Sequence, residues 1–166
     1  MNRGAITSAK RIVIKIGSSS LTGSAGSELD PHAVQKVVDL AYSLKKRGAE
    51  VVVVSSGAIA AGLSPLGLKV RPKDLATQQA AASVGQGLLI AQYSEKFKAH
   101  GVISSQVLLT TEDVVRRSHY ANAQQTLTKL LSLGVVPVIN ENDTVGTQEI
   151  RFGDNDRLAA LVALLI

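Results

Sequence analysis

The chain has 166 residues, 45% hydrophobic and 19% charged, so it can form one globular domain with a substantial core and is not intrinsically disordered. It contains no cysteine, which excludes disulfides, thiolate catalysis and thiolate metal sites. Its formal net charge is +5, but aromatic residues make up only 3% and are not interleaved with the basic clusters, so we expect no nucleic-acid partner.

The location of the protein in the cell is predicted from its first residues and its apolar runs. Residues 1–10 lack the apolar core of a signal peptide, and no apolar run approaches the roughly 20 residues of a membrane span. We therefore expect a cytoplasmic protein with no membrane partner. The basic clusters, of which residues 45–47 close a predicted helix, fit a solvated surface, and attraction of phosphorylated small molecules is the alternative.

The first half of the chain predicts two strands joined by a helix. Residues 11–17 and 50–55 are apolar, β-branched runs typical of buried strands. Residues 18–27 are rich in Ser and Gly and predict a loop. Asp30 and Pro31 form an N-cap and first helical position, and the helix they begin ends at Gly48. Because such a crossover is right-handed, the two strands are expected to lie parallel.

The second half continues the alternation. A long helix is predicted over residues 71–100, in which Gly85 and Gly87 indicate either close backbone packing or a break. A strand follows at 102–109, then a helix capped by Ser118, a strand at 135–139 and a short strand or hairpin near 147–152. The last helix, residues 158–166, is apolar on nearly every side, which predicts burial on both faces and a chain that is apparently truncated.

Polar residues at the carboxyl ends of these strands are the candidate site, because open α/β sheets bind ligands there. Lys15 lies within the first strand, just before the turn at Gly17 and Ser18, whose backbone N–H groups and ammonium could hold a phosphate. Ser56 and Gly57 follow the second strand, where small residues and a helix N-terminus could receive a carboxylate.

Acids and amides follow the last predicted strand at residues 140–143 and recur at 153–156. Asp154 has a structural explanation as a helix N-cap, and Asp156 is favoured in the first helical turn. Capping does not explain Asp143 and its neighbours as well, so we expect the cluster to bind a zwitterion. We predict no protein-bound metal site, because the three histidines are far from these acids in the sequence.

Four ordered segments resemble the glutamate 5-kinase family of the amino acid kinase superfamily: residues 15–19 (KIGSS), 54–62 (VSSGAIAAG), 137–144 (PVINENDT) and 152–158 (FGDNDRL). The resemblance implies a three-layer α/β/α sandwich with a mainly parallel central sheet. It also implies ATP- and Mg²⁺-dependent phosphorylation of the γ-carboxylate of L-glutamate, proline as feedback inhibitor and a homo-oligomer.

The resemblance assigns roles to nine residues. By this resemblance Lys15 is the phosphate-binding and catalytic lysine, in a glycine-rich turn with Gly17 and Ser18, and Asp156 is the acid that orients catalytic lysines. The glutamate-binding positions are Ser56, Asp143 and Asn155, with Gly57 and Asp154 beside the substrate.

The resemblance also marks a departure from the family. Residues 1–166 correspond to the amino-terminal, glutamate-binding part of the kinase domain, and the nucleotide-binding part is absent. Two alternatives stay open: a non-catalytic module that binds glutamate or proline, and another kinase of the superfamily, acting on carbamate, aspartate or acetylglutamate. A dinucleotide-binding domain is disfavoured, because the spacing of Gly57, Gly62 and Gly67 does not fit its fingerprint.

Overall fold

The computed structural model describes residues 8–23, 28–145 and 155–166. Its sheet has the strand order β1-β2-β4-β3, and each neighbouring pair is parallel: β1 (Arg11–Ile16), β2 (Glu50–Ser55), β3 (Ser104–Leu109) and β4 (Val136–Glu141). The prediction of a mainly parallel sheet is confirmed.

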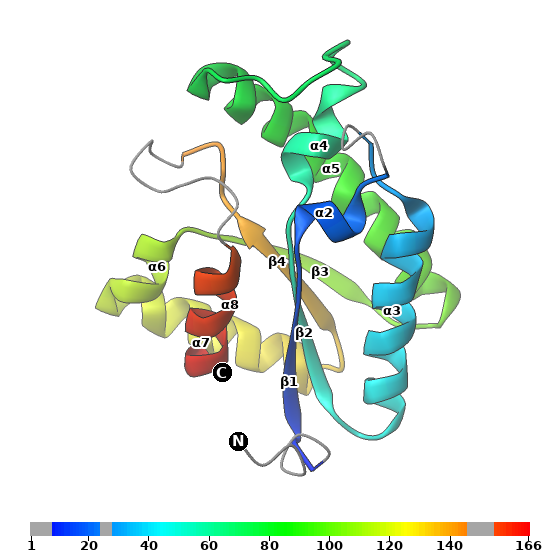
Figure 1. Ribbon diagram of the computed structural model, residues 1–166. Coiled ribbons are helices and arrows are strands. Elements are labelled where there is room, and N and C mark those ends of the chain that lie inside the picture. The colour runs from blue at the N-terminus through cyan, green and yellow to red at the C-terminus, as the bar shows by residue number, and fades with distance from the viewer. Residues whose placement is uncertain (1–7, 24–27, 146–154) are drawn as a thin grey trace.

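Helices cover both faces of the sheet (Figure 1). One face carries α3 (Pro31–Lys46) and α5 (Leu75–Ala99), and the other carries α7 (Arg117–Ser132) and α8 (Asn155–Leu165). Three short helices each follow the carboxyl end of a strand: α2 (Ser18–Leu21), α4 (Ala58–Leu63) and α6 (Thr111–Val115). This is the expected three-layer α/β/α sandwich.

The side chains of β2 alternate between the two helical layers. Val51 and Val53 pack with α3 and α5, whereas Val52 and Val54 pack with α7 and α8. Successive strand residues point to opposite faces, so a strand covered on both faces needs apolar residues at every position. The same alternation determines which layer the polar residues of the site will meet.

The predicted start of α3 is confirmed. Asp30 is its N-cap, with its Oδ1 accepting from the backbone N of His32 at 2.8 Å, and Pro31 is its first residue. The helix ends at Lys46, and Gly48 takes a left-handed conformation with φ 87° after it.

Residues 18–21 form one helical turn, α2, where a loop was predicted. The backbone N of Thr22 donates to Ser18 O at 3.0 Å, and Leu21 is fully buried in the core. Serine is a weak helix former and four residues show no period, so packing of Leu21 accounts for this turn.

Helix α5 begins at Leu75, four residues later than predicted, because Asp74 caps it by accepting from Thr77 N at 2.8 Å. The close packing predicted at Gly85 is confirmed: a Cβ there would overlap the carbonyl oxygen of Ala58, and one at Gly62 would overlap that of Ala81. Helices α4 and α5 therefore touch backbone to backbone. The prediction is wrong for Gly87, whose Cβ position has no described atom within 4 Å.

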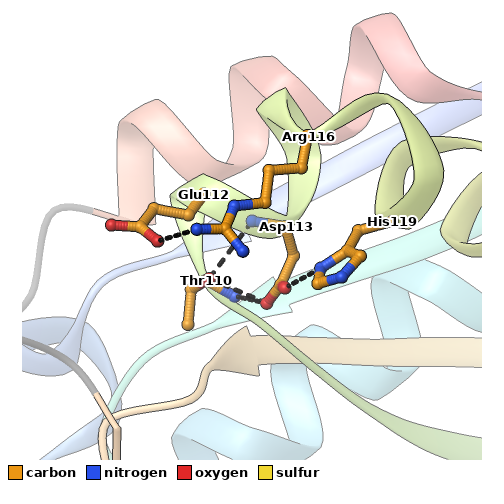
Figure 2. Close-up of polar contacts among 5 residues, drawn as sticks. All are labelled: Thr110, Glu112, Asp113, Arg116 and His119. Carbon is orange, nitrogen blue, oxygen red and sulfur yellow. Dashed lines mark hydrogen bonds and ion pairs between the residues drawn. The ribbon is translucent and has the colours of Figure 1, made fainter.

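Two helices follow β3 where one was predicted. Thr110 and Asp113 form a capping box at the start of α6: Thr110 Oγ1 accepts from Asp113 N at 3.2 Å, and Asp113 Oδ2 accepts from Thr110 N at 2.8 Å (Figure 2). Figure 2 also shows His119 Nδ1, 2.8 Å from Asp113 Oδ1. Arg116, not Ser118, is the N-cap of α7, so the prediction of Ser118 as the cap is wrong.

The last described elements also differ from their predicted bounds. β4 continues two residues past Ile139, so Asn140 and Glu141 are buried strand residues. α8 is described from Asn155 to Leu165, with Asp156 in its first turn as predicted. Its outer face is open, with Leu164 79% exposed, so among the described residues only its inner face is buried. The hairpin predicted near 147–152 lies outside the described residues. Within the described ranges, no helix combines the length and apolar character needed to cross a bilayer.

Candidate functional site

The carboxyl ends of β1, β2 and β4 bring three polar turns to one edge of the sheet, at the end where α2 and α4 lie in Figure 1. A cavity of about 270 Å³ lies at this edge. It is lined from α2, α4, the 64–74 connection, β4 with its following turn, and α8: Ser18, Ser19, Thr22, Ser56, Gly57, Ala58, Ile59, Ala60, Leu63, Arg71, Asn140, Glu141, Asp143 and Asn155. Its position is the one that parallel sheets use for ligands.

Asn155 is the centre of a buried hydrogen-bond network at this cavity. Its Nδ2 lies 2.7 Å from Ser55 O, 2.8 Å from Ser56 Oγ and 3.0 Å from Asn140 Oδ1. Its Oδ1 is buried too, but has no hydrogen-bond partner among the described residues. Because buried amide oxygens normally accept a hydrogen bond, this atom is a candidate ligand contact.

Helix α5 supports the network from one side of the sheet. Asn140 Nδ2 donates to Gln86 Oε1 at 2.7 Å, and the Tyr93 hydroxyl lies 3.1 Å from Ser55 Oγ. Burial raises the pKa of Tyr93 to about 12, while its hydrogen bond with Ser55 acts in the opposite direction, so the phenol stays neutral. Neither Gln86 nor Tyr93 was predicted from the sequence as a site residue, although their seven-residue spacing places both on one face of a helix.

Asp143 and Arg71 bring opposite charges to the cavity. Burial raises the pKa of the half-buried Asp143 carboxyl to about 6, and the positive charge of Arg71 lowers it in part. Arg71 was expected at the start of the long helix predicted over residues 71–100, but it lies in the 64–74 connection. The cavity therefore holds a carboxylate that titrates near neutral pH and a permanent cation.

Lys15 and Asp156 form a second polar group. Val13 packs toward α8, so Lys15, two residues later in β1, points to the same face. There its Nζ lies 2.6 Å from Asp156 Oδ1, and 3.5 Å from the position that a Cβ would take at Gly17. The Asp156 side chain is 76% exposed, so the pair is open to solvent and to an incoming ligand.

Gly57 makes the turn between β2 and α4 possible. Its φ of 103° lies in the left-handed region that favours glycine, and a Cβ there would come within 3.3 Å of Leu29 Cδ2. Gly57 is the N-cap of α4, whose first-turn residues Ala58 to Ala60 line the cavity and whose first N–H groups have no intrahelical acceptor.

The structure divides the predicted site residues into two sets. The first set lines the cavity: Ser18, Ser56, Gly57, Asp143 and Asn155. The second lies beside it, outside the described lining: Lys15, Gly17 and Asp156. The two sets are adjacent along the polypeptide, since Gly17 precedes Ser18 and Asn155 precedes Asp156. Asp154, the remaining predicted residue, lies outside the described residues.

Comparisons with known proteins agree with this architecture. The family model described as the amino acid kinase family matches residues 10–166. A curated relative named glutamate 5-kinase from Salinispora arenicola is 63% identical over 99% of this chain and 44% of the relative. Relatives of the same name from Thermobifida fusca and Leifsonia xyli subsp. xyli are 57% and 53% identical over 99% of this chain, covering 42% and 59% of their own lengths. The chain thus spans about half the length of these relatives.

Proposed function

This chain belongs to the amino acid kinase family, and from that premise we propose that it forms the glutamate-binding part of a glutamate 5-kinase. The proposed reaction is the ATP-dependent phosphorylation of the γ-carboxylate of L-glutamate to L-glutamyl 5-phosphate. Relatives at 53–63% identity that carry this name support the proposal. The proposal leaves most nucleotide contacts to a part of the enzyme beyond these 166 residues.

The observation that carries the proposal is the pairing of acceptors in the cavity. Asn155 Oδ1 is buried without a described donor, and Asp143 supplies a carboxylate in the same lining. An ammonium group has three N–H donors and no acceptor, so it suits these two acceptors. L-Glutamate carries one ammonium and two carboxylates, and needs donors elsewhere in the cavity.

Donors for the carboxylates come from three sources. Ser56 Oγ accepts from Asn155, so its own hydrogen is left to donate to a ligand. Ala58 to Ala60 in the first turn of α4 and Arg71 lie in the same lining, so the α4 N–H groups and the Arg71 guanidinium are the other candidate donors. The two carboxylates of L-glutamate can therefore be held by neutral donors and one cation.

The reaction needs alignment rather than a general base. The γ-carboxylate has a pKa near 4.3 and is already ionised at neutral pH, so it can attack as it is. Lys15 would bind an oxygen of the transferring phosphoryl group and stabilise its charge, and Asp156 would hold the Lys15 ammonium in place through the 2.6 Å contact. The backbone N–H groups of the turn at Gly17 and Ser18 would bind the neighbouring phosphate oxygens.

Mg²⁺ would neutralise charge on the phosphates of ATP. The described residues hold no group of three His, Asp or Glu side chains of the kind that binds a metal. We propose that the ion accompanies ATP, whose phosphate oxygens would be its main ligands.

Calorimetric titration with matched ligands tests the proposal. L-Glutamate has the full set of groups, glutarate lacks the ammonium, and L-glutamine lacks the γ-carboxylate. We expect L-glutamate to bind at least tenfold more tightly than either analogue, because hydrogen bonds to charged groups contribute about 1.5–3 kcal/mol. A preference for acetylglutamate, carbamate or aspartate would contradict the assignment and favour another kinase of the family.

Inhibition, assembly and location of the enzyme are proposed as well. Proline shares an ammonium and an α-carboxylate with L-glutamate, so we propose that it inhibits the enzyme, which a proline titration tests. Assembly into a homo-oligomer and a cytoplasmic location also remain predictions, to be checked by analytical ultracentrifugation and by fractionation of cells.

A further inference from the structure

A chain of buried amide side chains leads from α5 to the cavity. Gln86 Oε1 accepts from Asn140 Nδ2 at 2.7 Å, and Asn140 Oδ1 accepts from Asn155 Nδ2 at 3.0 Å. Each of the three side chains is at least nine-tenths buried. This series of hydrogen-bonded amides links three elements, α5, β4 and α8.

The direction of this series of amides is fixed at Asn155, because the Ser55 carbonyl oxygen can only accept and therefore takes the Asn155 NH₂ group. An amide has one oxygen that accepts and one NH₂ group that donates, so each link constrains the next. Asn140 therefore turns its oxygen toward Asn155 and its NH₂ toward Gln86, whose Oε1 accepts from it and holds Asn140 in this orientation. Asn155 in turn directs its NH₂ into the protein, and its Oδ1 is the atom left without a described partner.

The backbone of α5 holds Gln86 in place. Gly85, the residue before it, packs so closely against the Ala58 carbonyl that no Cβ would fit. Two turns later, Tyr93 contacts Ser55, whose carbonyl oxygen accepts from Asn155. Helix α5 therefore reaches the Asn155 amide by two routes, although Gln86 is not among the described residues that line the cavity.

We infer that Gln86 is a positioning residue that acts through Asn140 to present Asn155 Oδ1 to the ammonium of an amino-acid ligand. At neutral pH the only strong N–H donors of L-glutamate are on its ammonium, since both carboxylates are acceptors. Because Asn155 presents its Oδ1, which accepts, this position favours the ligand ammonium, which donates, over a carboxylate, which only accepts. The inference rests on the proposed function and deepens it, because it assigns part of the recognition of L-glutamate to a residue that does not touch it.

The test compares L-glutamate with glutarate, which lacks the ammonium, by calorimetry on wild-type protein and two variants. Gln86→Met keeps the length of the side chain but removes the acceptor, and we expect it to reduce the preference for L-glutamate by about tenfold with the Kd of glutarate unchanged. Gln86→Glu keeps an acceptor oxygen toward Asn140, and we expect it to keep most of the preference. Gln92→Met, the same change at a half-buried position on the same helix, is the control.

The outcomes separate the inference from the proposed function. A wild-type protein that does not prefer L-glutamate overturns both. A wild-type preference that survives Gln86→Met, or a variant that weakens both ligands equally, overturns only the positioning role. If Gln86→Met does not fold by circular dichroism, Gln86→Ser makes the same comparison, because its side chain is too short to reach Asn140.

Discussion

At the scale of single residues, Asp143 is a carboxyl group whose pKa is raised by its surroundings. Burial in the cavity raises its pKa to about 6, and Arg71 limits the rise. The folded protein therefore holds the proton more tightly than the unfolded chain, so ionisation of Asp143 reduces stability as the pH rises through about 6. The same ionisation creates the charge that a ligand ammonium needs.

Binding of L-glutamate is expected to weaken as the pH falls through about 6. Between pH 7 and pH 5 the ionised fraction of Asp143 drops about tenfold, while the γ-carboxylate of the ligand stays largely ionised. We expect calorimetry to show about a tenfold loss of affinity over this range. Asp143→Asn should abolish this pH dependence. A step that persists in Asp143→Asn would have to arise from another group.

Lys15 is expected to affect turnover more than binding of L-glutamate. It faces Asp156 beside the cavity and is not among the described lining residues, so its proposed contact is with the phosphoryl group. In the full-length enzyme, Lys15→Met should reduce kcat on the order of 10²-fold in an ADP-release assay, with little change in the KM for L-glutamate. Lys36→Met, at an exposed position of α3, is the control, and unchanged kcat in Lys15→Met would remove Lys15 from the mechanism.

At the scale of elements, the contact between α4 and α5 connects the fold to the site. Gly62 and Gly85 bring the two backbones together, α4 lines the cavity, and α5 carries Gln86 and Tyr93. No side chain can adjust in a contact between backbones, so a small change there should reduce both the stability of the fold and the affinity for the ligand.

Two glycines on α5 give a matched comparison of this contact. Gly85→Ala forces a methyl group into the Ala58 carbonyl, and we expect a loss of about 1–3 kcal/mol in the free energy of unfolding. Gly87→Ala places its methyl group in open space, and should be neutral or stabilising by up to about 1 kcal/mol. Urea unfolding of both variants measures the difference, and equal stability would show that α5 can move away from α4.

The capping box of α6 offers a second test at this scale. Thr110→Ala removes the oxygen that accepts from Asp113 N, and should cost about 1 kcal/mol in unfolding free energy. Ser118→Ala is the control, because Ser118 is exposed within the first turn of α7 and is not its N-cap. Urea unfolding that ranks Ser118→Ala as the more destabilising change would reverse this assignment of the caps.

At the scale of the whole molecule, the layers and much of the site follow from local patterns. The apolar run of β2 identifies a strand covered on both faces, and Asp30 with Pro31 identifies the start of α3. Because the carboxyl ends of parallel strands meet at one edge, Ser56 and Asp143 could be expected to lie together, and both line the cavity.

The rest depends on contacts that no local pattern records. Gln86 is 54 residues from Asn140, and Tyr93 is 38 residues from Ser55, so their roles appear only once α5 is packed on the sheet. Asn140 is polar and was expected to follow the strand, but partners on other elements allow it to be buried within β4. The single turn of α2 likewise depends on burial of Leu21.

Ligand binding is expected to stabilise the whole fold, because the cavity is lined from both halves of the described chain. At a concentration one hundred times its Kd, L-glutamate should add about 2.7 kcal/mol to the free energy of unfolding. For a chain of this length, that corresponds to a rise in Tm of about 5–10 °C, measurable by differential scanning calorimetry. Glutarate at the same concentration should give a smaller rise, and an unchanged Tm at saturating L-glutamate would contradict binding to the folded state.

Asn155 and Asp156 are consecutive on α8, yet the first is buried and the second faces solvent and Lys15. Neighbouring residues of a helix diverge by about 100° around its axis, and their angle is fixed by the backbone. A rotation of α8 about its axis that moves the Asn155 side chain must therefore turn the Asp156 side chain through the same angle. With the roles proposed for the two residues, binding of the amino acid at Asn155 and orientation of Lys15 by Asp156 are expected to be coupled through the backbone of α8.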